Sequence, residues 1–191
     1  RIEVLQGPQG TLYGKNTNAG AISVITRAPN MEEFEGFVEV SAGNYDLQKL
    51  SAAASGPLSD SLAYRLSGSA NQVNGYYDNG GTQEDFNESD DWNLQGKLLW
   101  EASDNTSILL NMSHVDRDQI CCGAESTQAE EVNNVLELQE FARDKNDPYD
   151  REVATDAPAS FEMESDSASL TIDYDNDWGA LKSITAWNDH E

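Results

Sequence analysis

Apolar and polar residues alternate with a period of two along much of this chain, and no other feature limits the possible folds as strongly. The clearest run is 92–101, WNLQGKLLWE, in which Trp92 and Trp100 fall on one side of an extended strand and Lys97 falls on the other. Four further runs alternate in the same way: 34–43, 62–71, 106–115 and 166–174. The segments 45–55 and 180–190 alternate less cleanly, so the pattern leaves their facing open.

Each run is about ten residues long, the length that a tilted strand needs to cross a bilayer, whereas strands of soluble sheets average five or six residues. Trp92 and Trp100 lie at the two ends of one apolar face, where the aromatic girdles of a membrane barrel meet the headgroups. A soluble β-sandwich would also have two faces, but its apolar face would pack a core and its strands would usually be shorter. No apolar run approaches the roughly 18 residues of a membrane-spanning helix. The mean hydropathy of −0.63 suits strands whose lipid-facing residues alternate with polar ones. We therefore expect a mainly β fold, a fragment of a transmembrane antiparallel β-barrel.

The connections between the runs differ in length in a regular way. GPLSD, ASDN and NDWG are tight turns, whereas the long acidic connections near 72–91 and 116–165 fall only on the opposite side of the sheet. Membrane barrels have short periplasmic turns and longer extracellular loops, so both connections are predicted to be extracellular and to make the outer surface strongly negative. Within the second, the stretch 129–144 has apolar residues near helical spacing and predicts a short surface helix.

The charge balance argues against one class of partner. With 35 acidic and 11 basic residues, the net charge of −24 is wrong for a nucleic-acid surface. Ser, His and acidic residues are present, but they form no nucleophile elbow and no catalytic constellation. We expect neither enzyme activity nor a cofactor.

Two near matches to metal sites are weak. Asp173, Asp175 and Asp177 occupy the first, third and fifth positions of a calcium loop, but Trp178 and Ile184 stand where glycine and glutamate are required. We predict a strand end and a polar turn at this position.

The two cysteines, Cys121 and Cys122, are neighbours and could form a strained vicinal disulfide, constrain a loop or remain two thiols. A zinc site there would need more ligands than His114 and His190 readily provide. We therefore expect no metal centre at the cysteines.

A glycine-rich stretch, GPQGTLYGKNTNAG, lies at 7–20 between two segments rich in Ile and Val that are typical of strands. A P-loop needs four residues between its first glycine and Gly-Lys, followed by Ser or Thr. Here three residues separate Gly10 from Gly14, and Lys15 is followed by Asn16. The Gly-x-Gly-x-x-Gly fingerprint is also absent, so the spacing argues against nucleotide binding.

Residues 1–29, RIEVLQGPQGTLYGKNTNAGAISVITRAP, resemble the C-terminal part of the plug domain of TonB-dependent outer-membrane receptors. The usual family form is close to R-I-E-V-L-R-G-P-Q-G-x-L-Y-G, followed by G-A-I-N-V-I-T. Residues 55–79, SGPLSDSLAYRLSGSANQVNGYYDN, resemble the first periplasmic turn and third barrel strand of the same family. The chain departs from the pattern at three positions, Gln6, Ala19 and Ser23, where arginine, glycine and asparagine are common. The first departure puts in doubt an ion pair from plug to barrel at that position.

The resemblance implies a plug inside a barrel of twenty-two strands, with the end of an α+β plug domain at 1–30 and about seven barrel strands at 31–191. It assigns a structural or gating role to the motif residues Arg1, Glu3, Gly7, Pro8, Gly10, Tyr13, Gly14, Lys15 and Gly20. Glycines would permit the sharp turns and close backbone approach of a domain packed in a lumen.

Three charged residues of that motif leave two readings open. Arg1, Glu3 and Lys15 could pair with lumen groups such as Glu35, Arg65 or Lys97, or they could simply be solvated.

The same resemblance implies a function for the whole receptor. Such a receptor captures a scarce nutrient, commonly a ferric siderophore, and imports it across the outer membrane when TonB pulls the plug. Its partners would be TonB, through a part missing here, together with outer-membrane lipid and lipopolysaccharide. Tyr76 and Tyr77 in an outer loop could stack on the ligand or pack within the loop. The alternative is a soluble secreted β-protein that binds cations or carbohydrate through its acidic loops.

Overall fold

The computed structural model describes residues 1–79, 85–120, 151–153 and 160–191, and it is built almost entirely from β-strands. The predicted mainly β fold is confirmed. In chain order the elements are β1 (Ile2–Gln6), α1 (Gly10–Tyr13), β2 (Gly20–Val24), β3 (Glu35–Ala42), β4 (Gln48–Ser59), β5 (Leu62–Val73), β6 (Asp78–Asn79), β7 (Glu88–Ser103), β8 (Thr106–Ile120), β9 (Glu152–Val153), β10 (Ser160–Asn176) and β11 (Gly179–His190). Among the residues described, no helix has the length and apolar character needed to cross a membrane.

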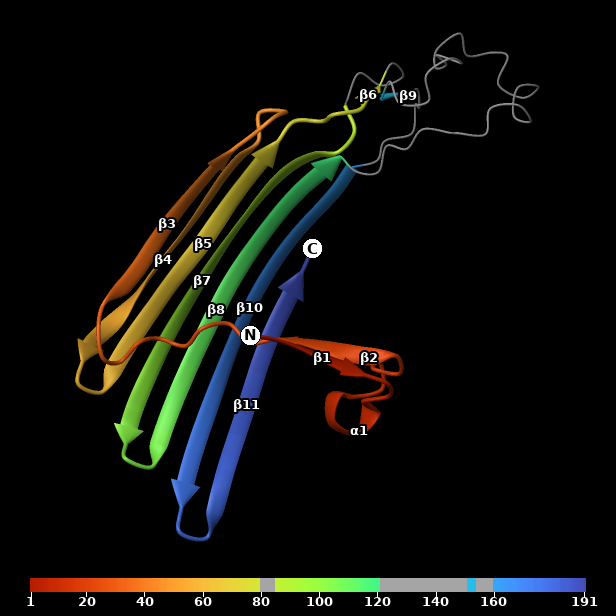
Figure 1. Cartoon of the computed structure of the whole chain (residues 1–191). Helices are drawn as coiled ribbons and strands as arrows, with labels where there is room; N and C mark the ends of the chain where they lie inside the picture. Colours follow the sequence, from red (N-terminus) through yellow and green to blue (C-terminus); the bar gives the residue numbers. More distant parts are fainter. Residues whose placement is uncertain (80–84, 121–150, 154–159) are drawn as a thin grey trace.

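Seven strands form one antiparallel sheet in the order β3-β4-β5-β7-β8-β10-β11, so each long strand pairs with the next one along the chain. The sheet is open and curved (Figure 1). Tight turns join β4 to β5, β7 to β8 and β10 to β11, as the sequence predicts. At the last of these, Asn176 Oδ1 accepts hydrogen bonds from the backbone N–H groups of Trp178 at 3.0 Å and Gly179 at 3.1 Å. Polar turn residues therefore cap the strand ends on this side.

The register gives the sheet one polar and one apolar face. A cross-strand row on the polar face runs through Glu35, Ser55, Arg65, Lys97 and Asn111. On the opposite face a comparable row runs through Tyr64, Leu98, Leu110 and Leu170. The facing predicted for the alternating runs is therefore the facing that the structure shows.

The register also settles the two segments whose facing the pattern left open. In β4, Leu50 and Ala52 pair with Val40 and Val38 and so join the apolar face. In β11, Trp187 lies opposite Ala168 on the apolar face, whereas Ile184 lies opposite Thr171 on the polar one. The alternation of β11 is unclear in sequence because an apolar residue occupies its polar face.

Several strands are longer than the alternation predicts: β7, β8 and β10 contain 16, 15 and 17 residues. β8 continues to Ile120 and β10 begins at Ser160, so both extend into the range 116–165 that the sequence pattern assigns to a loop. Most of the added residues are polar, with apolar exceptions such as Phe161 and Met163, yet their backbone groups pair all the same, because the hydrogen-bond ladder does not depend on side-chain polarity. Apolar alternation thus marks only part of each strand.

The two long connections meet through a short parallel pairing. β6 pairs with β9, with Asp78 opposite Glu152, and an isolated bridge joins Tyr77 to Phe86. Phe86 is buried, and its backbone exchanges hydrogen bonds with that of Tyr77. The helix predicted for 129–144, and Cys121 and Cys122 with their candidate disulfide, lie outside the described residues.

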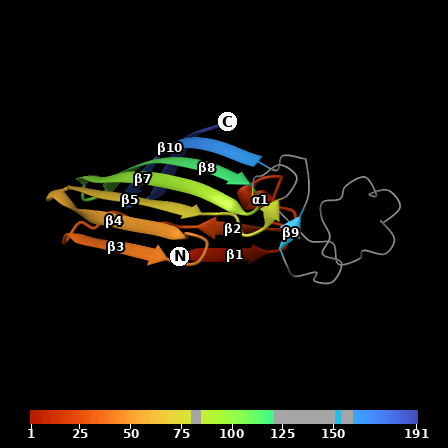
Figure 2. The same cartoon turned by 90° about the horizontal axis from the view of Figure 1, so that it is seen from above.

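The N-terminal hairpin stands apart from the large sheet. β1 and β2 pair antiparallel, from Ile2 opposite Val24 to Gln6 opposite Gly20, and α1 is a single turn between them. The hairpin projects from the sheet (Figure 1 and Figure 2). The segment 25–34 connects β2 to β3 and crosses the polar face of the sheet on its way.

Candidate functional site

The connecting segment contacts the polar face of the sheet at Lys97. The side chain is only 7% exposed, although most of this curved face is open. Its Nζ atom donates to the carbonyl oxygen of Arg27 at 2.8 Å and to Thr26 Oγ1. A lysine ammonium has three donors and is rarely buried unless it is paired, so these two acceptors account for its position. β7 places the charge there because Lys97 is a polar-face residue in the middle of a long strand.

Like charges lie side by side at this site, and one carboxylate compensates them. Arg65 is directly opposite Lys97 on the neighbouring strand. Glu35 Oε1 accepts a hydrogen bond from Arg65 Nη1 at 3.2 Å, and Glu35 Oε2 lies 3.9 Å from Arg27 Nη1. Directly opposed like charges destabilise a sheet, so the Glu35 carboxylate and the acceptors from the connecting segment offset this repulsion.

A second anchor holds the same segment nearer to β3. The backbone N–H of Asn30 donates to Ser55 Oγ at 2.9 Å, and that hydroxyl donates to the carbonyl oxygen of Tyr64 at 3.0 Å. Ser55 is fully buried. The Asn30 side chain accepts hydrogen bonds from the N–H groups of Glu32 and Glu33 and so turns the chain into β3. We call the seven residues of these contacts the linker contact: Thr26, Arg27, Asn30, Glu35, Ser55, Arg65 and Lys97.

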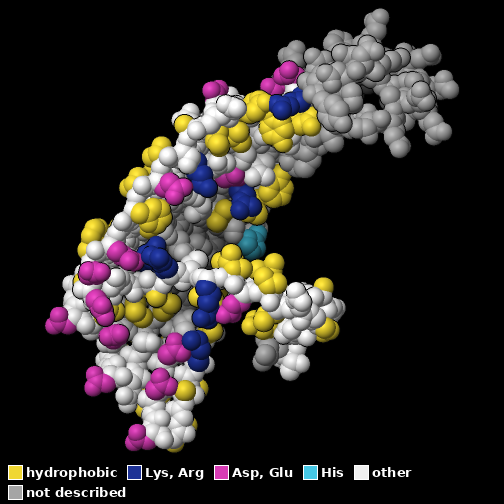
Figure 3. Space-filling model, in the orientation of Figure 1, with side chains coloured by type: hydrophobic (Ala, Val, Ile, Leu, Met, Phe, Trp, Pro, Cys, Tyr) yellow, Lys and Arg dark blue, Asp and Glu magenta, His cyan; other side chains and the backbone are white. Residues whose placement is uncertain are grey.

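The space-filling view shows the same face, with Lys and Arg side chains among acidic and other polar ones (Figure 3). The linker contact is therefore polar: the Arg27 and Glu35 side chains are open to solvent, whereas Lys97 and Ser55 are buried. A hydrogen bond contributes about 0.5–1.5 kcal/mol net, and more when one partner is charged. The arrangement can therefore hold the connecting segment on the sheet.

The ion pairs considered in the sequence analysis, between Arg1, Glu3 or Lys15 and the sheet residues, do not form in the structure. Arg1, Glu3 and the sheet residues have other partners. Arg1 Nε lies 2.7 Å from Glu3 Oε1, so these two residues pair with each other. Glu35 and Lys97 contact Arg27 instead. Within the described residues, Lys15 forms no ion pair and is exposed.

The glycine motif shapes the hairpin at specific positions. Gly20 has a φ of +148°, and a Cβ added there would lie 2.5 Å from the backbone oxygen of Leu5. Gly7 and Gly14 have φ values of +82° and +86°, which larger residues seldom adopt. Gly10 has neither a positive φ nor a close neighbour, so the hairpin itself does not require glycine there. Pro8 and Tyr13 lie in the same irregular part of the hairpin, on either side of Gly10.

Tyr76 and Tyr77 lie at the far end of the sheet within an aromatic cluster. The ring of Tyr76 is 5.6 Å from that of Tyr45 and 5.2 Å from that of Tyr77. The guanidinium of Arg151 lies 5.7 Å from the centre of the Tyr45 ring, and its Nη1 atom donates to the Tyr45 hydroxyl. Tyr45 and Arg151 have φ values of 59° and 64°, which non-glycine residues seldom adopt outside functional or tightly held sites. The cluster presents aromatic faces and a cation.

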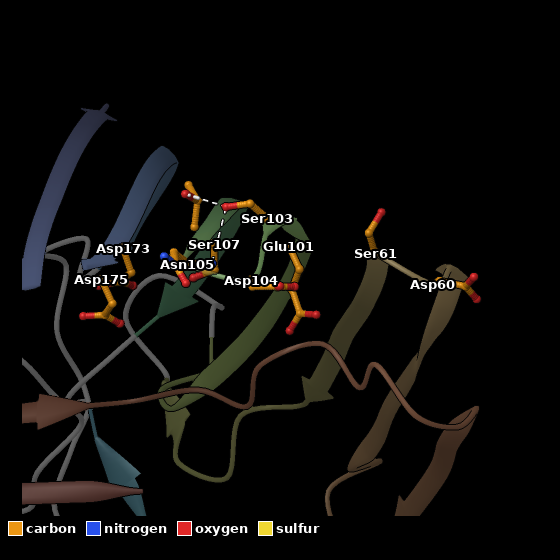
Figure 4. A pocket seen from close by; sticks show the side chains of 10 residues that line it. Asp60, Ser61, Glu101, Ser103, Asp104, Asn105, Ser107, Asp173 and Asp175 are labelled. Carbon is orange, nitrogen blue, oxygen red and sulfur yellow. Dashed lines mark hydrogen bonds between the residues drawn. The ribbon is translucent and has the colours of Figure 1, made fainter. Parts of the chain in front are cut away.

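A pocket of about 500 Å³ opens at the opposite end, beside the tight turns. Its acidic side chains spread along the edge rather than converging, as Figure 4 shows for Asp60, Glu101, Asp104, Asp173 and Asp175. Asp173 lies 2.9 Å from Lys182 Nζ, and both it and Asp175 belong to β10. The sequence prediction of a strand end and a polar turn here is confirmed.

The chain is similar in sequence to receptors of bacterial outer membranes. It is 26% identical over 205 residues to a probable TonB-dependent siderophore receptor PirA of Acinetobacter baumannii. The aligned region covers 98% of this chain and 24% of that receptor. It is 29% identical over 110 residues to a ferrioxamine receptor of Yersinia enterocolitica. This aligned region covers 58% of this chain and 14% of that receptor. No family model matches the chain.

The solved structure of the ferric yersiniabactin uptake receptor FyuA from Yersinia pestis superposes on this chain with a TM-score of 0.76 at 22% identity. The superposition covers 99% of this chain and 28% of FyuA. The fold is that of a TonB-dependent receptor fragment.

The resemblance of residues 1–29 and 55–79 to TonB-dependent receptors is thereby confirmed, and the matched proteins are receptors rather than enzymes, as expected. The chain spans about a quarter or less of the length of the curated receptors named here, 24% and 14%. The substrate and partners of the whole protein therefore do not follow from this likeness alone.

Sequence reasoning missed several residues that the structure brings together. Thr26 and Arg27 lie at the end of the family pattern and Asn30 follows it, but nothing in the pattern pointed to their contacts with the sheet. Tyr45 and Arg151 are 106 positions apart, and no local signal connects them.

Proposed function

We propose that this chain forms the rear part of the plug, residues 1–30, and the first seven barrel strands, within 31–191, of a TonB-dependent outer-membrane receptor. The receptor takes up a ferric siderophore or a similarly scarce nutrient with energy coupled through TonB. The names of the matched proteins support this proposal, since they include siderophore and ferrioxamine receptors. The plug and barrel divide in the segment between β2 and β3, where the linker contact lies.

The uncovered apolar face of the sheet carries the proposal. Its large side chains are exposed on all seven strands of the sheet: Val38, Leu50, Leu66, Trp92, Leu94, Leu98, Trp100, Met112, Leu170, Leu181 and Trp187. Soluble monomers rarely expose apolar patches beyond a few hundred Å². Trp92 and Trp100 are separated by eight residues of one strand, or about 26 Å, which is close to the height of a barrel's apolar band.

The soluble alternative requires a second layer over this face. None of the described residues provides one, because the N-terminal hairpin and its connecting segment lie on the polar side. A bilayer is the simplest cover for rows of apolar side chains flanked by tryptophan at both ends.

The linker contact determines where the plug can separate from the barrel. When TonB pulls the plug from the periplasmic side, the hydrogen bonds from Lys97 to Arg27 and from Asn30 to Ser55 hold the connecting segment on the sheet. Lys97 and Ser55 are buried, so breaking these bonds would leave polar groups without partners at a cost of about 1–3 kcal/mol each. In this account the segment 25–34 stays attached to the barrel while the hairpin before it moves.

The aromatic cluster is the proposed contribution of this chain to ligand binding. Tyr76 and Tyr77 lie with Tyr45 and Arg151 at the end of the sheet that faces the cell exterior in the proposed orientation. Aromatic rings and a guanidinium suit a planar or anionic ligand such as a ferric chelate. TonB would bind a part of the receptor outside this chain, and lipid and lipopolysaccharide would surround the sheet.

A growth experiment tests the proposal. A strain lacking the full-length gene is grown with single iron sources, with cobalamin and with glycans, and is then complemented with the wild-type gene. The proposal predicts that growth on at least one ferric siderophore depends on the gene and on TonB. Equal growth of the deletion strain on every nutrient, with the protein recovered in the soluble fraction, would overturn it.

A further inference from the structure

The apolar face changes character at the end away from the tight turns. Along β10 the outward residues are apolar from Tyr174 to Ala168, and then become Asp166 and Glu164. His114 on β8 is directly opposite Asp166, and Asp189 on β11 is opposite Asp166 on the other side. Nitrogen and carboxylate donors thus replace hydrocarbon on three adjacent strands.

Three of these side chains converge. One ligand atom from each of His114, Glu164 and Asp166 lies within 4.8 Å of the other two. His114 Nδ1 and Asp166 Oδ1 are already 2.9 Å apart, and the exposed Glu164 side chain has room to rotate toward them. Tetrahedral zinc holds its ligand atoms about 3.4 Å apart, so a small rotation of the Glu164 side chain would bring all three ligand atoms to that spacing.

Among the residues that the structure describes, no lysine or arginine side chain forms an ion pair with the carboxylates around the three residues. Asp116 is opposite Glu164, and Asp166 is opposite Asp189, so like charges face each other across neighbouring strands. Directly opposed like charges destabilise the sheet by repulsion, and acidic groups on a lipid-facing surface also destabilise it because they lose water. Among the described residues, the salt bridges of this face comprise only the contact between His114 and Asp166. A bound divalent cation would offset both the charge repulsion and the cost of desolvating the carboxylates.

The imidazole is held in a fixed orientation. The ring of Trp92 lies 4.6 Å from that of His114 at an angle of 38°, and Asp166 holds Nδ1 from the other side. Packing against Trp92 thus pre-positions the imidazole, and the Asp166 carboxylate already lies at the nitrogen that would bind the ion. The donor set of one imidazole and two carboxylates suits Zn²⁺, Co²⁺ or Ni²⁺ better than Mg²⁺ or Ca²⁺, which prefer oxygen alone.

We propose that His114, Glu164 and Asp166 bind one divalent transition-metal ion of the zinc class on the outward face of the sheet. The ion takes the position now bridged by the hydrogen bond between His114 Nδ1 and Asp166 Oδ1, any proton it displaces leaves to solvent, and water completes its coordination. This site goes beyond the proposed transport function and does not depend on it. It also differs from our sequence expectation, because the cross-strand register, which supplies the carboxylates, is not visible in the spacing of the histidines.

The test uses the full-length protein in detergent, stripped with a chelator and titrated with ZnCl₂ by calorimetry. We expect His114→Ala and Asp166→Asn each to remove one site or to weaken it by about tenfold or more. His190→Ala and Asp175→Asn are the matched controls, because they change the other histidine and an acid of the same strand on the polar face. Both controls should keep the site.

A second measurement covers the case in which His114→Ala does not fold. CoCl₂ added to the folded protein should quench the fluorescence of Trp92, which contacts the His114 ring, and Trp92→Phe should remove that component. The conservative variant Glu164→Gln should reduce the quenching as well. Equal zinc stoichiometry and affinity in the wild type, Asp166→Asn and Asp175→Asn, with no cobalt quenching assigned to Trp92, would overturn the proposal.

Discussion

Lys97 donates a hydrogen bond from its Nζ atom to the carbonyl oxygen of Arg27, 2.8 Å away and 70 positions earlier in the chain. The two residues join the sheet to the segment that leads from the N-terminal hairpin, which the Asn30–Ser55 hydrogen bond also anchors. The stability of this segment on the sheet should therefore depend in large part on the buried ammonium group of Lys97.

Replacing Lys97 with methionine keeps the length of the side chain and removes its donors. Arg27 O and Thr26 Oγ1 then lose their partner, which should destabilise the docked segment by about 1–3 kcal/mol. Hydrogen exchange of residues 25–34, measured by mass spectrometry, should become about five- to hundredfold faster. Lys182→Met is the control, since its pair with Asp173 is largely exposed and worth less than about 1 kcal/mol. Unchanged exchange in Lys97→Met would show that the hydrogen bonds do not hold the segment.

Gly20→Ala should loosen the N-terminal hairpin. The new Cβ would lie 2.5 Å from the backbone oxygen of Leu5, and no side-chain movement can relieve a clash with backbone. We expect a loss of about 1–3 kcal/mol, seen as faster hydrogen exchange in β1 and β2. Gly10→Ala is the matched variant, because nothing lies within 4 Å of its added Cβ. Similar exchange in both variants would contradict the described hairpin geometry.

An arginine on the apolar face should be costly, and an arginine on the polar face should not. Leu98 points outward from the middle of β7, and Asn93 lies on the polar face of the same strand. In lipid vesicles, Leu98→Arg should lower the free energy of unfolding by about 2–4 kcal/mol. Asn93→Arg loses only the hydrogen bond to Ser69 and should stay within about 1.5 kcal/mol of the wild type. If urea titrations show that Asn93→Arg lowers the free energy of unfolding more than Leu98→Arg does, the facing of β7 is the reverse of the one described.

Tyr76 should contribute to ligand binding through its ring. Tyr76→Ala removes a ring that contacts both Tyr45 and Tyr77, and a lost aromatic contact is worth about 0.5–1.5 kcal/mol, or roughly two- to tenfold in affinity. Tyr76→Phe keeps the ring and should bind the transported chelate as the wild type does. Affinity for the chelate identified by the growth experiment is measured by intrinsic fluorescence. Equal affinities of all three proteins would remove Tyr76 from the proposed ligand site.

The sheet could be predicted from sequence because its two faces differ in polarity at the level of single residues. Trp92 and Lys97 occupy opposite sides of one run, and the register places them on opposite faces of the sheet. The ends of the strands could not be predicted in this way. Asp116 and Glu164 are polar and outward-facing, so nothing in their pattern distinguishes a paired strand from a loop.

The linker contact and the metal site could not be predicted for a different reason. Each depends on residues that are distant in the chain and adjacent only through register, such as Arg27 with Lys97 and His114 with Asp166. The family pattern directed attention to Arg1, Glu3 and Lys15, which do not contact the sheet through the described ion pairs. Thr26 ends the family pattern and Asn30 follows it, but neither carries a charge that would suggest a partner, so their contacts with the sheet are visible only in the structure.

The central claim is that the apolar face of the sheet contacts hydrocarbon, and lipid quenching of its tryptophans tests this most directly. The full-length protein is placed in vesicles whose lipids carry a doxyl group near the headgroup end of the acyl chain. The quenched signal is then assigned by comparison with Trp92→Phe and Trp100→Phe. Trp92 and Trp100, which are 42% and 49% exposed on that face, should be strongly quenched, whereas Trp178 in the tight turn, 85% exposed, should be quenched weakly. The account would be contradicted if Trp92 and Trp100 were both weakly quenched and the protein stayed in solution without detergent.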